Sequence, residues 1–259
     1  MNIGRFAGLC AASVTLTYRA IAKGPLRAHP SGQLLLRIGA DQKRIWSCPV
    51  AAARGNGWKP VLSVVAVTAA LIALDPVDAP WFQQAVFRDT PAMRRLNRIL
   101  SGGNMALLIN AVPLGFFVGG LLRRNPYAWQ SGLLAGEAAA NAEIVAIAMK
   151  HIDRRMRPIE VGPKGDFTRT WFRTKSHAID GAGCFPSGHT ASAFAVATIL
   201  AERYRNYRWA GLLAFGLAGT VGASRVTARA HFPSDVFFGA ALGYSISHFA
   251  VMRRDVTGQ

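Results

Sequence analysis

Apolar segments bounded by arginine or proline constrain the fold of this chain more than any of its other features. A helix of about 20 apolar residues crosses the ~30 Å hydrocarbon core of a bilayer, and hydrophobic residues occupy 51% of the 259 positions. We therefore predict an all-α fold, a six-transmembrane-helix bundle, whose first and shortest helix tilts or uses flanking residues to span. The predicted spans are residues 61–74, 105–122, 127–149, 187–202, 209–223 and 233–252.

The rest of the chain divides around these spans. Residues 1–57 are rich in arginine, lysine, alanine and glycine and show no sustained hydrophobic period. This composition predicts a basic, disordered N-terminal extension ahead of a membrane domain of residues 58–254. Residues 82–100 mix arginines with large apolar side chains, which predicts an amphipathic helix at the membrane interface.

The formal net charge of +17 predicts an anionic partner. Because the basic residues are interleaved with apolar segments, we exclude nucleic acid and expect the lipid bilayer surface or an anionic lipid substrate. Short arginine-rich turns at residues 123–124 and 203–208 favour a cytoplasmic N-terminus under the positive-inside rule. The long polar loop of residues 151–185 then lies on the extracytoplasmic side.

The third predicted span contains three polar residues, Glu137, Asn141 and Glu143. A charge inside a bilayer costs roughly 2.5–3.5 kcal/mol on insertion scales, so these side chains are expected to face the interior of the bundle. We interpret them as a structural polar network rather than as catalytic groups. The three cysteines of the chain fit no metal-ligand spacing.

A phosphate-sized anion site is predicted at the start of the fourth span, where the sequence reads Pro186-Ser187-Gly188-His189. Proline suits the first turn of a helix, and the free backbone N–H groups of a helix N-terminus bind anions. His189 can donate or accept a proton near neutral pH. An ordinary capped helix beside an unrelated histidine would give the same four residues.

Two cations flank the end of the third span, in the run from Lys150 to Arg157-Pro158. If the helix continues past Lys150, the two side chains lie two turns apart on one face and approach one anion from two sides. Pro158 disfavours helical backbone at Arg157, so the guanidinium lies where the chain turns. A solvated basic run beside the membrane is the alternative interpretation.

A third polar motif precedes the sixth span and consists of Ser224-Arg225, His231, Pro233 and Asp235. We predict that Pro233 is the first residue of the sixth helix. Asp235 then falls in the first turn, where its carboxylate can reach the preceding segment. A carboxylate bonded to one nitrogen of His231 would leave the other nitrogen free as a nucleophile. The alternative is a helix cap beside an exposed histidine.

In the predicted topology the three motifs lie at span ends on the same side of the membrane. Together they supply several cations, a helix N-terminus, two histidines and one carboxylate. This combination predicts phosphoryl transfer without a metal. The cations bind the anion, one histidine attacks phosphorus, and the other protonates the leaving oxygen.

The three motifs resemble the type 2 phosphatidic acid phosphatase family, whose pattern is K-x6-R-P, P-S-G-H and S-R-x5-H-x3-D. That family shares its site with vanadium-dependent haloperoxidases and bacterial non-specific acid phosphatases, and the resemblance covers residues 58–254. It implies that His231 is the phosphorylated nucleophile, that Asp235 orients it and that His189 is the general acid. It also implies an extracytoplasmic site with no metal or other cofactor. The implied phosphate-binding residues are Lys150, Arg157, Ser187, Gly188 and Arg225.

The resemblance implies an integral membrane phosphatase of a bacterial inner (plasma) membrane that hydrolyses phosphate or diphosphate monoesters of lipids. Phosphatidic acid, undecaprenyl diphosphate, phosphatidylglycerol phosphate and a lipid A phosphate are the candidate substrates. One alternative is a lipid phosphotransferase that passes the phosphoryl group to a second lipid. The other is a non-catalytic membrane scaffold or transporter, against which the intact His189 and His231 argue.

Overall fold

The computed structural model describes residues 34–54, 58–84, 90–99, 102–162, 165–174 and 183–252. Within these ranges every regular element is helical, and no strand occurs. The elements are α2 (Leu34–Arg54), α3 (Trp58–Gln84), α4 (Pro91–Ile99), α5 (Gly102–Leu122), α6 (Pro126–Asp153), α7 (Pro158–Val161), α8 (Gly188–Arg203), α9 (Arg208–Thr227), α10 (Pro233–Ser245) and the π-helix η3 (Ile246–Met252).

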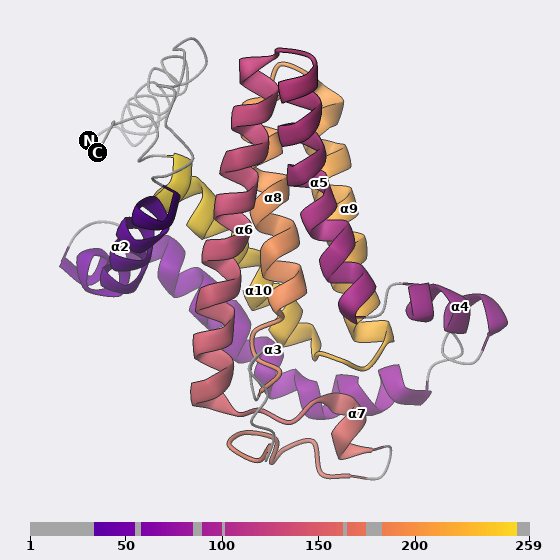
Figure 1. Cartoon of the computed structure of the whole chain (residues 1–259). Coiled ribbons are helices and arrows are strands. Elements are labelled where there is room, and N and C mark those ends of the chain that lie inside the picture. Colours follow the sequence, from indigo (N-terminus) through magenta and orange to yellow (C-terminus); the bar gives the residue numbers. More distant parts are fainter. Residues whose placement is uncertain are drawn as a thin grey trace, which may run out of the picture.

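The helices α5, α6, α8 and α9 lie side by side, α10 packs against α8, and α3 crosses the bundle obliquely (Figure 1). Two glycines of α10 allow its backbone to approach α8 closely. A Cβ on Gly239 would lie 2.7 Å from the carbonyl oxygen of Ser187, and one on Gly243 would clash with the carbonyl of Ala191. Since the paired positions follow in the same order, α8 and α10 run parallel and begin at the same end of the bundle.

Small side chains form the centre of the bundle. Ala135, Ala138 and Ala142 of α6 and Ala191 and Ala195 of α8 are fully buried. Alanine at such positions lets helix backbones approach closely, which is how helices pack within a membrane. The bundle therefore has a small-residue interior that holds the ends of α6, α8 and α10 in fixed relative positions.

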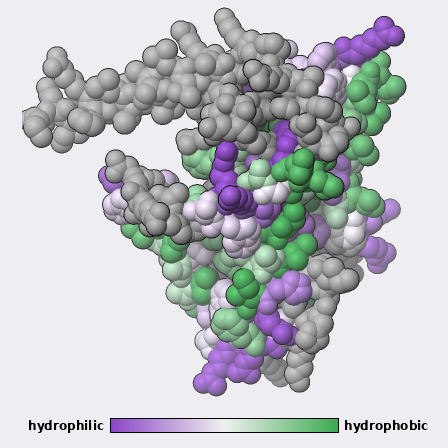
Figure 2. All heavy atoms as spheres, turned by 60° about the vertical axis from the view of Figure 1, so that its left-hand side comes forward, coloured by the Kyte–Doolittle hydropathy of each residue, from purple (hydrophilic) through white to green (hydrophobic). Residues whose placement is uncertain are grey.

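Four helical segments are long and apolar enough to cross a bilayer. Large apolar side chains such as Leu107 and Leu114 of α5 are exposed, and Figure 2 shows apolar patches beside polar ones on the face that it draws. An extended apolar surface of this kind marks contact with a membrane, and the chain is an integral membrane protein. The four segments are Trp58–Phe82, Gly103–Leu122, Pro126–Val161 and Pro233–Met252.

The six segments predicted to span are all helical, but the first is longer than predicted. The prediction ended it before Asp75-Pro76, whereas α3 has 27 residues and continues through Pro76 and Pro80. Contacts of the Asp75 side chain with α10 and with the chain after α6 hold the helix through this point. In the predicted interfacial segment 82–100, α4 covers Pro91–Ile99.

The N-terminal extension differs from the prediction more strongly. Residues 34–54 form the helix α2, which packs against α6 and η3, where the sequence predicted disorder. The contacts of α2 with α6 are largely polar, and a search for hydrophobic periodicity does not detect such contacts. Residues 1–33 and 55–57 of the predicted extension lie outside the described residues.

The prediction that the polar residues of the third span face inward is confirmed. Glu137 and Asn141 are 2% and 0% exposed and contact side chains of α2. Glu143 accepts a hydrogen bond from Ser192 Oγ of α8 at 3.0 Å. Glu137 and Asn141 thus bond α6 to α2, and Glu143 bonds α6 to α8.

Candidate active site

The start of α8 is a capped helix N-terminus. Ser187 is the N-cap, with its Oγ 3.5 Å from the Thr190 backbone N and 2.8 Å from Thr190 Oγ1. Gly188 is the first helical residue, so Pro186 precedes the cap and does not lie in the first turn as predicted. Because Ser187 supplies the cap, the first backbone N–H groups of α8 form the positive end that the sequence predicted.

The start of α10 follows the prediction. Pro233 is its first residue, and Asp235 lies in its first turn, where Oδ2 accepts the Phe232 N–H at 2.8 Å. The backbone carbonyl of Asp235 accepts the Ser187 N–H at 3.0 Å. This bond joins the starts of α8 and α10, so the segment that carries His189 lies beside the segment that carries Asp235.

His231 is buried between these two helix starts, with 5% of its surface exposed. Its Nδ1 lies 2.7 Å from the Cys184 carbonyl oxygen and 3.6 Å from Asp235 Oδ2. The predicted orienting carboxylate is therefore adjacent, but the carbonyl is the group within hydrogen-bonding distance. The reason is that Asp235 already accepts hydrogen bonds from Phe232 and Arg155.

The environment of His231 keeps its imidazole neutral. Burial lowers the pKa of His231 from 6.5 to about 4, and the charges of Lys150 and Arg157 act in the same direction, while the Asp235 carboxylate opposes them. A neutral imidazole has a free lone pair on one ring nitrogen. His231 therefore satisfies the electronic requirement for a nucleophile at neutral pH.

We predict that the His231 ring titrates near pH 4 in the folded protein, well below the ordinary histidine value. Between pH 6.5 and about 4 the unfolded chain binds a proton that the folded chain excludes, so the contribution of His231 to stability falls as the pH falls through this window. Histidine-selective NMR would measure the pKa, with the His231→Gln spectrum identifying the resonance. Titration of that resonance between pH 6 and 7 would contradict the burial argument.

The predicted cations come from three places at the same end of the bundle. Lys150 is 6% exposed in the last turn of α6, and Arg225 is 3% exposed at the end of α9. The Arg225 carbonyl accepts the His231 N–H at 3.3 Å, which fixes the two residues relative to each other. Lys150 and Arg157 both act on the charge of His231, so the three motifs converge on one region.

The predicted relation between Lys150 and Arg157 is wrong in one respect. α6 ends at Asp153, Arg154 has a left-handed backbone (φ 45°), and Arg157 is the N-cap of α7. The two cations therefore do not share a helix face. Arg157 lies where the chain turns, as its position before Pro158 predicted.

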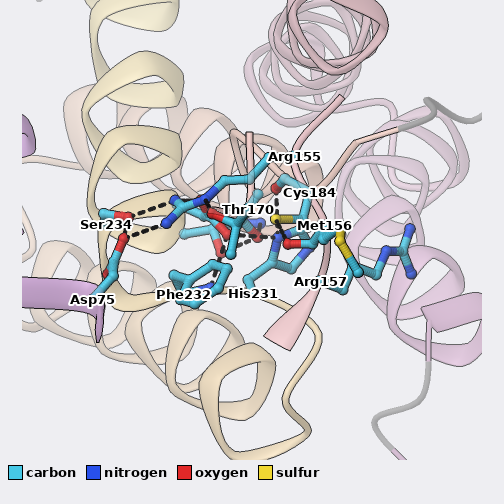
Figure 3. Close-up of polar contacts among 12 residues, drawn as sticks. Asp75, Arg155, Met156, Arg157, Thr170, Cys184, His231, Phe232 and Ser234 are labelled. Atoms are coloured by element: carbon cyan, nitrogen blue, oxygen red, sulfur yellow. Dashed lines mark hydrogen bonds and ion pairs between the residues drawn. The ribbon is translucent and has the colours of Figure 1, made fainter. Parts of the chain in front are cut away.

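Sequence analysis missed Arg155, which occupies the centre of the polar network in Figure 3. Its guanidinium is 2.5 Å from Asp75 Oδ2, 2.6 Å from Asp235 Oδ1 and 2.9 Å from Ser234 Oγ. It also lies 3.9 Å from the ring centroid of Phe232, a cation–π distance. This side chain joins α3, α10 and the end of α6 beneath the candidate nucleophile. The sequence did contain a signal for this residue. Asp75 directly follows the first predicted apolar span, and an acid in such a place requires a cationic partner.

One group of side chains lies close enough together to hold a metal ion. It consists of Cys184, His231 and Asp235, whose possible ligand atoms lie within 4.8 Å of one another. The atoms that could bind a metal already have hydrogen-bond partners or close polar contacts. Asp235 accepts hydrogen bonds from Arg155 and Phe232, His231 Nδ1 lies against the Cys184 carbonyl, and Cys184 Sγ lies 3.1 Å from the Met156 carbonyl. A guanidinium on the carboxylate would also oppose a cation there, so the grouping fits a hydrogen-bonded network better than a metal site.

Fold and site together define an all-helical membrane protein with a buried neutral histidine, three cations and a helix N-terminus at one end of the bundle. Such an arrangement is suited to phosphoryl chemistry. Residues 131–256, which contain every predicted site residue, match the model of the PAP2 superfamily.

Two known proteins are similar to the chain. A lipid A 1-phosphatase from Porphyromonas gingivalis is 36% identical over 83 residues, which cover 30% of this chain and 19% of that protein. The chain thus matches about a fifth of the length of this relative. The crystal structure of a transmembrane PAP2 type phosphatidylglycerolphosphate phosphatase from Bacillus subtilis matches with a TM-score of 0.51 and 22% identity, over 78% of this chain and 95% of that chain. This second likeness shows the fold.

Proposed function

We propose that the protein is a membrane lipid phosphatase that hydrolyses phosphate or diphosphate monoesters through a phosphohistidine on His231, without a metal. The observation that carries the proposal is the 2.7 Å contact between His231 Nδ1 and the Cys184 carbonyl. A carbonyl oxygen only accepts, so the ring proton lies on Nδ1 and donates to it. Nε2 then holds the free lone pair that attacks phosphorus.

The proposed reaction has two steps, each with a defined path for the proton. His231 Nε2 forms a bond to phosphorus as the bond to the lipid oxygen breaks, and protonated His189 gives its proton to that oxygen. Neutral His189 then takes a proton from water, the water oxygen attacks phosphorus, and the P–N bond breaks. Inorganic phosphate leaves, and His231 is neutral again.

In this proposal the remaining predicted residues bind the phosphoryl group. Lys150, Arg157 and Arg225 supply cations, and Ser187 with the Gly188 N–H supplies the helix terminus. Asp235 stabilises the positive charge that His231 gains during attack, since its Oδ2 lies 3.6 Å from Nδ1. The similar proteins are named for phosphatases of lipid A and phosphatidylglycerolphosphate, which supports phosphorylated lipids as the substrate class.

The proposed topology has six crossings, with α8 and α9 added to the four segments identified above. Two observations support it. All six predicted spans are helical, and the arginine-rich turns between α5 and α6 and between α8 and α9 lie at the opposite end of the bundle from α7 and the site (Figure 1). With those turns in the cytoplasm of a bacterium, the site faces the extracytoplasmic side of the inner membrane.

The proposal is tested by giving the purified protein phosphatidic acid, phosphatidylglycerol phosphate, undecaprenyl diphosphate and a lipid A 1-phosphate, and measuring inorganic phosphate. We expect release from at least one lipid, unchanged by a chelator and inhibited by vanadate. A newly phosphorylated lipid in place of free phosphate would instead indicate a phosphotransferase. No reaction with any of these lipids would contradict an enzymatic role for the site on them.

Replacing Arg225 with alanine is expected to raise KM and to lower kcat. The cation contacts the phosphoryl oxygens in both the ground state and the transition state, and a hydrogen bond to a charged group contributes about 1.5–3 kcal/mol. The corresponding fall in kcat/KM is about 10- to 100-fold. Steady-state kinetics on the best substrate of the panel measure both constants. A change confined to KM would contradict a contact that strengthens in the transition state.

A further inference from the structure

The helix α2 has its polar and apolar sides reversed relative to a helix on the surface of a water-soluble protein. Such a helix buries its apolar stripe and exposes its charges. In α2 most residues turned toward the bundle are charged or polar, with the partly buried Ile45 among them, while Leu35, Leu36 and Trp46 are 81%, 75% and 50% exposed. The inward polar residues are Arg37, Asp41, Gln42 and Arg44.

Each of these inward residues contacts a polar group of the bundle. Gln42 Nε2 donates to Asn141 Oδ1 at 2.8 Å, and Asn141 Nδ2 donates to Asp41 Oδ2 at 3.1 Å. Arg37 forms an ion pair with Glu137 at 2.8 Å. The polar side of α2 is thus matched to the polar network on α6, and this match leaves the apolar side facing outward.

The contacts also fix the depth of α2 in the membrane. α6 has 28 residues, a length of about 42 Å at 1.5 Å per residue, and Glu137 and Asn141 lie about 17 and 23 Å from its start. The hydrocarbon core is ~30 Å thick, so both residues lie near the middle of a helix that crosses it. A segment bound to them lies at hydrocarbon depth.

We propose that α2 is embedded in the bilayer, with its polar side bonded to α6 and its Leu35–Leu36 side in contact with lipid hydrocarbon. The reversed pattern is the one that this environment selects, because charged side chains inside a membrane face the protein interior and pair with one another. Lys43 is exposed on α2, and its stem is long enough to place the ammonium toward the headgroups. The lipid-contact surface comprises Leu35, Leu36, Gly39, Ala40 and Trp46.

Cysteine accessibility tests the proposal on the full chain. Leu36→Cys and Ala40→Cys change exposed positions of α2, so we expect the fold to be preserved. Each variant is placed in phosphatidylcholine–phosphatidylglycerol nanodiscs, where both membrane faces meet water, and treated with a water-soluble maleimide. Mass spectrometry of the peptide that contains the new cysteine separates its labelling from that of the native cysteines. Arg123→Cys and Arg169→Cys, in exposed turns at opposite ends of the bundle, are the matched controls.

We expect the two α2 cysteines to be labelled at least about tenfold more slowly than the controls, because hydrocarbon excludes the reagent and suppresses the thiolate. A nitroxide at the same positions should collide with oxygen more often than with a water-soluble nickel complex, which distinguishes lipid from a protein interior. Labelling as fast as in the controls would overturn the proposal. A Leu36→Cys disulfide between two chains in liposomes would overturn it as well, since a second copy of the chain would then cover this face.

Discussion

Replacing His231 with alanine is expected to lower kcat by at least about a thousandfold while lipid phosphate binding persists. Loss of a nucleophile removes the covalent route and costs several orders of magnitude in rate. The substitution keeps the backbone N–H of residue 231 that bonds the Arg225 carbonyl, so we expect the anion site to survive. Phosphate release from the best lipid substrate measures the rate, and vanadate-dependent protection against thermal unfolding measures binding.

His151→Ala is the matched control for that experiment. His151 follows Lys150 directly in α6 and is exposed, so its removal should leave kcat within about twofold of the parent, as is usual for an exposed residue outside a site. Turnover by the His231→Ala protein at the parent rate would exclude His231 as the nucleophile. An equal loss in both variants would point to general damage at this end of the bundle.

Replacing Arg155 with methionine is expected to be among the most destabilising single changes in the described part of the chain. The side chain is 1% exposed and pairs with two carboxylates, Asp75 and Asp235. Removing one member of a buried ion pair costs about 3–5 kcal/mol, because the remaining charge is left uncompensated. The thermal unfolding midpoint in detergent should fall, and activity should fall with it because Asp235 and the start of α10 lose their support.

Two further variants separate charge from geometry at Arg155. Arg155→Lys keeps the charge but lacks the planar fork that reaches both carboxylates, so we expect it to remain destabilised. Arg169→Met removes an arginine whose side chain is 76% exposed and should leave the midpoint unchanged. An Arg155→Met protein with the parent midpoint and activity would show that the network is dispensable.

The sequence predicted the start of α10 better than the network that supports it. Pro233 and Asp235 follow local rules for helix termini, so their positions could be inferred from neighbours in the chain. Arg155 could not, because its partners Asp75 and Ser234 are distant in sequence and meet only in the folded bundle. The same distance explains why the Cys184 carbonyl was missed as the partner of His231, since a backbone oxygen has no sequence signature.

The helices likewise could be predicted where local sequence determines them, and could not where distant contacts do. Apolar length identified the segments that became α3, α5, α6, α8, α9 and α10. It failed for α2, which is too polar for a membrane span and contacts Glu137 and Asn141 of α6 through polar side chains. It also ended the first span at Asp75, because a charge and a proline end most helices, whereas here the charge is neutralised by Arg155.

In the proposed mechanism His231 carries the phosphoryl group during turnover. The most direct test mixes the protein with ³²P-labelled phosphatidic acid, or with the lipid of the panel that reacts fastest, and quenches the reaction in alkali within one turnover. We expect a label that survives alkali, is lost in acid and maps to the peptide containing His231. Turnover at the full rate with label on no protein residue, or with label on His189, would contradict it.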